Sequence, residues 1–373
     1  MENNTFEFQR KQLKKKLANI AGLTGGRDAF AGTASVLFEI INGKCSIKAT
    51  DLKTGLKQSI DVISPNEAAT CCADKIICEI IKEVESETLT FALNDKHILL
   101  VAGKGKFKIP CYPVDNFPLW PDEEKGGGVC IINGADLASC LKKAIPFTDR
   151  NKHDIKNCVL LEVSPDNLKF VSTDGYRLAM IVNKEAKTDG VPCDRQYLFP
   201  ASSASEIINF LSGKEEEAVI LLGEKHVIIR VKNEDELYVR LFEPGSYPEY
   251  KKIIRDYSND AKMFVNKEAL IKALKRVSIL STQKAVKFVI KENLLTLYSS
   301  SDIGEATEEV EVVYTPSNEA DAEFKIAFNF EFILDILRAA SPDDMIFHFS
   351  GARKPAYIKG SEDELFVVMP MIL

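Results

Sequence analysis

The stretch KEALIKALKRVSIL, residues 267–280, spaces its apolar residues as on one face of a helix, and two earlier stretches repeat its pattern. Leu270 and Leu274 lie four residues apart, with basic residues around them. The stretches RKQLKKKLANI (10–20) and GADLASCLKKAI (134–145) have the same leucine spacing. Because residues four apart share a helix face, the sequence predicts an amphipathic helix that occurs three times, with a period of about 125 residues.

Other features recur with the same period. A strand pair with a turn aspartate follows each helix, at Asp51, Asp174 and Asp302. Alternating strands and a second helix then recur, the second helices being expected at 73–84, 203–213 and 330–340. The aspartates are typical of turns in which the side chain accepts backbone hydrogen bonds. The predicted fold class is therefore α+β: three tandem domains, each with two helices packed on antiparallel sheets, covering residues 1–125, 126–254 and 255–373.

Composition agrees with a multidomain globular protein. Of 373 residues, 45% are hydrophobic and 28% are charged, which is enough apolar material for several cores. No run of about 18 uncharged apolar residues occurs, so we expect no membrane span. The amino-terminal residues lack a signal-peptide pattern, and a cytoplasmic protein is expected.

The nine cysteines form no C-x-x-C pair, and only four histidines accompany them. We expect reduced, buried thiols and neither a metal site nor a cofactor. The group Cys71, Cys72 and Cys78 is the only candidate for another role, and it is expected on one face of a helix.

The first helix of each repeat carries basic residues away from its leucines, although the net charge is −7. The residues on these outer faces are Lys11, Lys15, Lys142, Lys143, Lys272, Lys275 and Arg276. A solvated lysine face is the alternative interpretation of any one helix. Three equivalent basic faces in an acidic protein favour sequence-independent contact with a phosphate backbone, and no groove-reading motif accompanies them.

Two predicted sheet edges carry opposite charges. GKGKFKIP (103–110) has lysines around Phe107 and Ile109, whereas IGEATEEVEV (303–312) is rich in glutamate. An exposed strand edge needs a cover or a partner, so this pair suits head-to-tail association, which closes a ring where the rotation permits. The alternative is that these charges only keep two solvent-facing edges from aggregating.

Five motifs occur in one order along nearly the whole chain. They are Gly25-Gly26-Arg27, STDGYRLA (172–179), YPEYKKII (247–254), RVSILSTQK (276–284) and the terminal VVMPMIL (367–373). With these motifs the chain resembles the bacterial β sliding clamp family, the processivity factors of the replicative DNA polymerase.

The resemblance implies a ring of two head-to-tail subunits whose helices surround duplex DNA, with no catalytic residues and no cofactor. The dimer contacts it implies are Lys104, Lys106, Phe107 and Ile109 against Ile279, Leu280, Glu305 and Glu308 of the partner subunit. It also places Arg27 on DNA, with Arg150 and Lys152 in a loop that could touch it.

The resemblance further implies an apolar groove between the second and third domains. There, short linear peptides of the polymerase, the clamp loader and other clamp-binding proteins would dock. The implied groove residues are Thr173, Gly175, Tyr176, Arg177, Leu178, Pro248, Ile253, Pro355, Val367, Met369, Pro370 and Met371, with Arg177 near the rim. Flexible methionines suit a promiscuous pocket, and binding near a micromolar Kd, about −8 kcal/mol, is expected. This sequence departs from the family at Tyr176, where histidine is common, at Ile372, where arginine is common, and at Lys156, where an apolar residue is expected.

Two other functions compete with this one. An enzyme could use Asp174 with His153 and Cys158, but the chain contains no G-x-S-x-G, H-E-x-x-H, Walker or dinucleotide motif. A clamp-like paralogue could bind peptides as an adaptor without ever encircling DNA.

Overall fold

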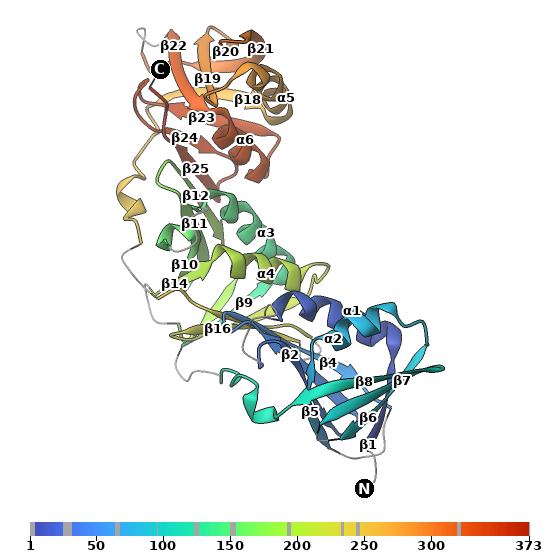
Figure 1. Cartoon of the computed structure of the whole chain (residues 1–373). Coiled ribbons are helices and arrows are strands. Elements are labelled where there is room, and N and C mark those ends of the chain that lie inside the picture. Colours follow the sequence, from blue (N-terminus) through green and yellow to red (C-terminus); the bar gives the residue numbers. More distant parts are fainter. Residues whose placement is uncertain are drawn as a thin grey trace. The chain divides into compact units, whose positions relative to one another are not determined.

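The computed structural model describes residues 4–24, 32–63, 68–94, 96–122, 127–149, 154–191, 195–232, 235–243, 247–318 and 322–372 (Figure 1). The chain forms two compact units. The first consists of Met1–Ala135, Lys187–Pro192 and Glu206–Leu241, and the second consists of Asp136–Ala186, Cys193–Ser205 and Phe242–Leu373. The predicted second domain therefore contributes to both units.

The first unit contains one continuous antiparallel sheet. Its strands are β1 (Asn4–Gln9), β2 (Ser35–Ile41), β3 (Lys44–Thr50), β4 (Thr54–Asp61), β5 (Ala69–Asp74), β6 (Thr88–Asn94), β7 (His97–Ala102), β8 (Gly105–Tyr112), β9 (Val129–Asn133), β13 (Lys187–Asp189), β15 (Glu217–Leu222), β16 (His226–Arg230) and β17 (Glu236–Arg240). The strand order is β1-β6-β7-β8-β5-β2-β3-β4-β17-β16-β15-β9-β13. The pairing of β17 with β4 joins strands from the first two predicted domains.

The second unit contains a second such sheet. Its strands are β10 (Cys158–Ser164), β11 (Asn167–Thr173), β12 (Arg177–Asn183), β14 (Gln196–Pro200), β18 (Ala261–Asn266), β19 (Ala285–Lys291), β20 (Leu294–Ser301), β21 (Gly304–Thr315), β22 (Glu323–Asn329), β23 (Asp344–Phe349), β24 (Ala356–Lys359) and β25 (Glu364–Val368). The strand order is β14-β10-β11-β12-β25-β24-β23-β18-β21-β20-β19-β22. Here β12 pairs with β25, the last strand of the chain.

The helices confirm the repeat. The α-helices are α1 (Arg10–Ile20), α2 (Ile76–Glu83), α3 (Gly134–Ala144), α4 (Ala201–Leu211), α5 (Lys267–Val277) and α6 (Phe330–Ala339). Short 3₁₀ turns are η1 (Ala21–Leu23), η2 (Val114–Asn116), η3 (Ile145–Phe147), η4 (Ile155–Asn157), η6 (Tyr250–Lys252) and η7 (Ser278–Leu280). The first helices of the three repeats, α1, α3 and α5, lie in the three predicted stretches, and the last predicted stretch ends in η7 instead of continuing as α-helix.

The predicted apolar seams of the first helices are buried. Leu13, Leu17 and Ile20 are the buried residues of α1, and Leu270 and Leu274 are buried in the same way on α5. Burial of each such side chain contributes about 1.5–3 kcal/mol, so these seams hold the helices on their sheets. At its start, α5 is capped by the Asn266 side chain, which accepts the Ala269 N–H at 3.1 Å.

The cysteine group was assigned to the wrong element. Cys71 and Cys72 lie in β5, and only Cys78 lies in α2. The reason is that β5 pairs along its length with β2, while the Asp74 side chain accepts the Ile76 N–H at 2.9 Å and so begins the helix after the cysteines. Long-range strand pairing thus outweighs the local helical pattern.

The described residues include eight cysteines, and all eight are free thiols. Among the described residues, no group of three or more metal-ligating side chains is arranged to hold an ion. None of the helices described is both long and apolar enough to cross a membrane.

Candidate functional site

The TDGYRLA motif forms the tight turn between β11 and β12. The Asp174 carboxylate accepts the backbone N–H groups of Tyr176 at 2.9 Å and Arg177 at 3.0 Å. Gly175 has a φ of +94°, which side-chain-bearing residues rarely adopt. The turn therefore holds Tyr176 out into solvent, with 65% of its surface exposed. Asp51 makes the equivalent turn in the first repeat, so the predicted role of the aspartates is confirmed at both positions.

Arg177, predicted near the rim of the groove, is a buried connector that also lines the neighbouring cavity. Its guanidinium donates to Asp174 at 2.9 Å, to Asp335 at 2.7 Å and to the Pro146 carbonyl at 2.8 Å. The guanidinium also lies 4.4 Å from the ring centre of Phe332. These contacts bury all but 7% of Arg177 and tie β12 to α6.

A cavity of about 370 Å³ opens beside this connector. Its lining residues are Thr148, Asp149, Asp174, Tyr176, Arg177, Glu331, Phe332 and Asp335. Tyr176 and Phe332 form an aromatic pair there, with ring centres 6.5 Å apart. The α6 residues of this cavity were not predicted from the sequence. Phe332 could have indicated them, because it is an aromatic residue close to the charged positions of a predicted helix.

The three segments predicted to form the groove do meet. Leu178 on β12 pairs with Val367 on β25, and both are buried in one cluster with Tyr247, Tyr250 and Tyr357. These tyrosines fill the space beneath the two strands. Leu178 and Val367 are therefore the floor of the site and not its open surface.

Two hydrogen bonds hold the 247–254 segment on this floor. The Tyr250 hydroxyl donates to Glu162 at 2.6 Å, and the Tyr357 hydroxyl donates to the Ile253 carbonyl at 2.6 Å. Burial and the Glu162 carboxylate raise the pKa of Tyr250 far above its usual range, so this hydroxyl keeps its proton. Ile253 remains 41% exposed, and Pro248 is half-buried.

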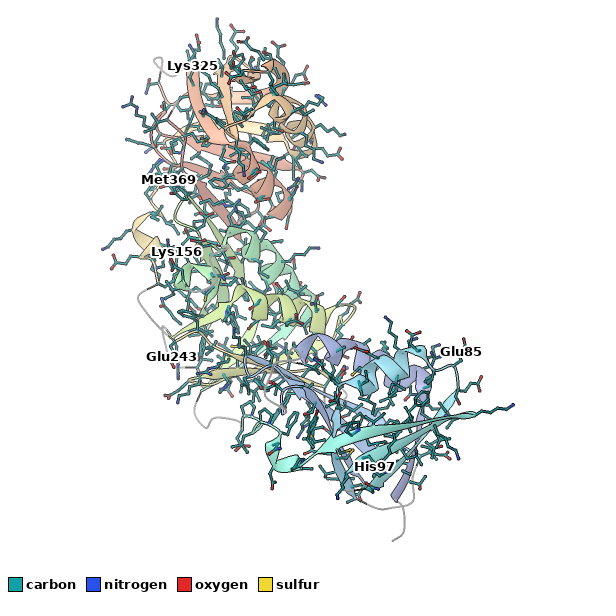
Figure 2. The ribbon with its side chains drawn as sticks, viewed as in Figure 1. Glu85, His97, Lys156, Glu243, Lys325 and Met369 are labelled. Atoms are coloured by element: carbon teal, nitrogen blue, oxygen red, sulfur yellow. The ribbon has the colours of Figure 1, made fainter. Side chains whose placement is uncertain are left out.

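The carboxyl-terminal tail continues from β25 across the same unit. The Met369 N–H donates to the Tyr176 carbonyl at 2.8 Å, and the Met371 N–H donates to the Ala327 carbonyl at 2.7 Å. Met369 is 42% exposed, and Figure 2 labels it at the end of the last strand. Pro355, Pro370 and Met371 are half-buried. The groove surface (Tyr176, Ile253 and Met369) is thus apolar and accessible.

Lys156, which stands where an apolar groove residue was expected, lies in η4 of the same unit. Its ammonium is 3.7 Å from the Asp154 carboxylate, and its side chain is 34% exposed.

On α1, the predicted basic face is present. Lys11 and Lys15 are exposed, whereas Lys16 forms an ion pair with the largely buried Asp235 at 2.8 Å. A hollow of about 330 Å³ beside the helix is lined by Gln12, Lys15, Lys16, Lys44, Ser59, Ile60 and Asp61. The lysines of this hollow could hold phosphate oxygens.

The basic residues of α3 behave differently from one another. Lys142 is exposed, but the Lys143 ammonium lies 2.7 Å from Glu364 and 2.6 Å from Ser341. Burial alone raises the pKa of Glu364, yet the hydrogen bonds from Lys143 and Ser341 outweigh it and hold that pKa below its usual range. Lys143 therefore joins α3 to β25 and is not an outward-facing cation.

On α5, Lys275 is exposed and Lys272 pairs with Glu268 at 3.2 Å. Arg276, predicted to contact DNA, is exposed and makes two hydrogen bonds of 2.7 Å with Glu308, predicted to contact the partner subunit. Arg27, Arg150 and Lys152 lie outside the described residues.

Both predicted strand edges are open in the described residues. Gly105–Pro110 of β8 pairs with β7, and β5 joins β8 only at Cys111 and Tyr112. Likewise β21 pairs with β20 over residues 304–311, and its other side is paired with β18 only from Val312. Each edge therefore exposes unpaired backbone groups.

The side chains on these edges differ from the prediction at one position. Lys104, Lys106 and Glu305 are exposed, Phe107 and Glu308 are half-exposed, and Ile109 is only 1% exposed. Because side chains alternate along a strand, Ile109 points into the core of the first unit, so its prediction as a surface contact is wrong. Ile279 is 76% exposed, and the neighbouring Leu280 is half-buried.

Comparison with known families gives three matches in order along the chain. Residues 4–121 match the family model of the DNA polymerase III beta subunit, N-terminal domain. Residues 135–249 match that of the central domain, and residues 257–372 match that of the C-terminal domain.

Curated relatives match over nearly the whole length. The chain is 26% identical to the beta sliding clamp of Pseudomonas putida and 24% identical to that of Escherichia coli K12. Each alignment covers 99% of this chain and 100% of the relative.

Solved structures share the fold. The DNA polymerase sliding clamp of Pseudomonas aeruginosa has a TM-score of 0.89 at 24% identity, covering 99% of this chain and 100% of the other. The DNA polymerase III beta subunit of Thermotoga maritima has a TM-score of 0.86 at 25% identity, covering 99% of both chains. A sliding clamp of Bartonella birtlesii bound to griselimycin has a TM-score of 0.87 at 25% identity and covers both chains completely.

Proposed function

Since the chain belongs to the DNA polymerase III beta-subunit family, the bacterial beta sliding clamps, we propose that it encircles duplex DNA as a head-to-tail homodimer. It has three tandem clamp domains and is a processivity factor, not an enzyme. The proposed domain limits are 1–125, 126–254 and 255–373. In this role it tethers the replicative polymerase, and by the same site the clamp loader and other clamp-binding proteins, in the bacterial cytoplasm.

The observation that carries the ring is the pair of open strand edges with opposite charges. The β8 edge of one subunit can accept the β21 edge of the partner, which satisfies backbone groups that are unpaired in the single chain. Lys104 and Lys106 then face glutamates of the β21 edge, and Phe107 can pack on Ile279 of the partner subunit. Such a contact is heterologous, so two copies close a ring when the rotation between them permits.

The DNA-facing set, meaning the basic residues proposed to contact DNA, is chosen by the exposure of their side chains. Lys11, Lys15, Lys142, Lys272 and Lys275 keep exposed ammonium groups on the first helix of each repeat, so they remain candidates. Lys143 is held by the buried Glu364 and leaves this set, whereas Arg276, whose side chain is 56% exposed beside Glu308, stays in it as a prediction. Arg27, Arg150 and Lys152 stay predictions. Lysines of this kind bind phosphates without reading sequence, as a sliding protein requires.

Replacing Lys11 and Lys15 by glutamate should weaken binding to a short linear duplex by about tenfold at low salt, because two phosphate contacts become repulsive. Fluorescence anisotropy of a labelled duplex measures this affinity, which does not depend on closure of the ring. The control pair Lys53→Glu and Lys187→Glu makes the same change in charge at exposed positions outside α1. Affinity equal to that of the unchanged protein would remove these helix residues from the DNA-facing set.

The peptide site combines the groove surface with the neighbouring cavity. Its aromatic and methionine side chains offer apolar contact, while Asp149, Glu331 and Asp335 make the cavity acidic. We expect partner peptides with an apolar anchor beside a basic residue. The buried tyrosine floor makes the contact shallow, which agrees with a Kd near micromolar and with frequent exchange of partners.

Deleting residues 369–373 should lower affinity for a short peptide of the organism's replicative polymerase by at least about tenfold. The deletion removes Met369 but leaves the β12–β25 ladder, which extends to Val368. Fluorescence polarisation of the labelled peptide measures the change, with Leu119→Ala, an exposed apolar position of the first unit, as control. Undiminished affinity after the deletion would place the peptide elsewhere.

A further inference from the structure

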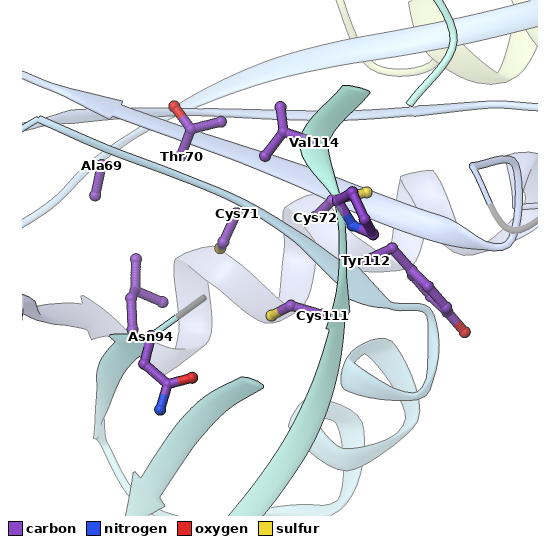
Figure 3. A pocket seen from close by; sticks show the side chains of 10 residues that line it. Ala69, Thr70, Cys71, Cys72, Asn94, Cys111, Tyr112 and Val114 are labelled. Atoms are coloured by element: carbon purple, nitrogen blue, oxygen red, sulfur yellow. The ribbon is translucent and has the colours of Figure 1, made fainter. Parts of the chain in front are cut away.

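A second cavity, of about 300 Å³, lies in the first unit, where β5 and β8 meet (Figure 3). Its lining residues are Ala69, Thr70, Cys71, Cys72, Leu93, Asn94, Cys111, Tyr112, Pro113 and Val114. None of them belongs to the groove, the basic helix faces or the charged pairs of the subunit edges. Three thiols at one cavity therefore need a separate explanation.

Two of these thiols face each other. The strand pairs Cys72–Tyr112 and Ala73–Cys111 join β5 to β8, so Cys71 lies diagonally from Cys111 on the same face of the sheet. The two sulfurs are hydrogen-bonded to one another, and Figure 3 shows them turned toward each other. The Cys72 sulfur lies on the other face, where it contacts the Ser35 hydroxyl at 2.9 Å.

The environment distinguishes the two facing thiols. The Cys71 S–H donates to Cys111, and the Ile98 backbone N–H donates to the same sulfur, so the pKa of Cys111 is lowered despite partial burial. For Cys71, the same hydrogen bond and its burial raise the pKa well above the usual range. Cys111 is half-exposed at the cavity, whereas Cys71 is only 6% exposed. Because a small disulfide in the cavity reaches the more exposed sulfur first, Cys111 attacks and Cys71 resolves.

We propose that Cys111 and Cys71 form a redox-active dithiol that reacts with small disulfides of the glutathione type. In the first step the Cys111 thiolate attacks one sulfur of oxidised glutathione, forms a mixed disulfide and releases one glutathione thiolate. In the second step Cys71 loses its proton, attacks the Cys111 sulfur and releases the second glutathione. The protein thus loses two electrons and two protons, and one oxidised glutathione becomes two reduced molecules.

Closure of the Cys71–Cys111 bond requires the sulfurs to move from hydrogen-bond contact to about 2 Å. The place of the pair in the sheet allows this movement. Among the described residues, β8 is joined to β5 by only two residue pairs, after which the chain continues into Pro113 and η2. On its other side the β7 ladder ends at Pro110, so movement of Cys111 disturbs the two β5 pairs and the hydrogen bond of 2.9 Å from the Cys111 N–H to the Lys96 carbonyl.

The test treats the full-length reduced protein with oxidised glutathione, blocks remaining thiols with N-ethylmaleimide and maps non-reduced peptides by mass spectrometry. We expect a link between Cys71 and Cys111, retained when Cys72 is replaced by serine. In a Cys71→Ser variant, Cys111 should instead keep glutathione, because no resolving thiol remains. Limited labelling of the unchanged protein should modify Cys111 at least about tenfold faster than Cys78, a half-buried thiol whose pKa is raised to about 11 by burial.

The unchanged protein decides the question even if a variant fails to fold, which circular dichroism reports. Complete reaction without a Cys71–Cys111 link would overturn the proposal. So would labelling of Cys78 at the rate of Cys111, or a link that forms through Cys72.

Discussion

Replacing Ile279 and Leu280 by aspartate is expected to leave the protein monomeric at concentrations where the unchanged chain is a dimer. Ile279 is 76% exposed in the single chain, and an exposed apolar side chain of this kind is typical of a protein interface. At the proposed seam, two carboxylates would enter an apolar contact with the Phe107 side of the partner. A cost of about 4 kcal/mol corresponds to association weakened by about a thousandfold.

Sedimentation equilibrium measures this effect directly, since the dimer has twice the subunit mass of 41.5 kDa. The matched control is Val313→Asp, because Val313 is 60% exposed on the part of β21 that pairs with β18, beyond the open edge at 304–311. The control should dimerise normally. A dimer that survives both aspartates at 279 and 280 would show that this surface is not the seam.

Replacing Arg177 by methionine is expected to destabilise the second unit by about 3 kcal/mol, because a buried ion pair loses one partner. Methionine keeps the aliphatic packing beside Phe332, so the loss isolates the charge. Asp174 and Asp335 would remain with 14% and 24% exposure and without the guanidinium. The turn that presents Tyr176 would loosen with them, and peptide affinity should fall in parallel.

Arg338→Met provides the matched control. Arg338 contacts the same Asp335, at 3.5 Å, but its own side chain is 56% exposed. An exposed pair of this kind contributes less than about 1 kcal/mol. Native-state hydrogen exchange of the β12 amides measures the local opening free energy of each variant. Equal losses in the two variants would contradict the role of Arg177 as a buried connector.

The parts of the fold that follow from local pattern could be predicted from the sequence. The helices α1, α3 and α5 begin and end within a few residues of their predicted limits, because each buries one apolar stripe and its neighbours are polar. The turn at Asp174 was equally predictable. The aspartate side chain accepts a hydrogen bond from the backbone N–H two residues later, and the glycine between them allows the tight turn.

Contacts between distant segments could not be predicted in this way. Lys143 was predicted as a surface cation because nothing near it in sequence indicates a partner. Its partner, Glu364, lies on the last strand of the chain. The Arg177–Asp335 pair has the same character. Ile109 was misplaced because the strand edge was identified correctly, but the cover over its apolar face was not: Phe107 is half-exposed there, whereas Ile109 on the same face is buried.

Retention on DNA of different topology tests the central claim most directly, namely that the chain surrounds duplex DNA. The protein is loaded onto closed circular DNA, the salt is raised, and one sample is cut once with a restriction enzyme before gel filtration. A closed ring predicts that the protein stays on the uncut circle at high salt and leaves the linear molecule. A protein held only by charge would leave both at high salt, with log affinity falling by about 0.9 per phosphate contact per log unit of salt. Equal loss from circle and linear DNA would contradict encirclement and favour the peptide-binding adaptor.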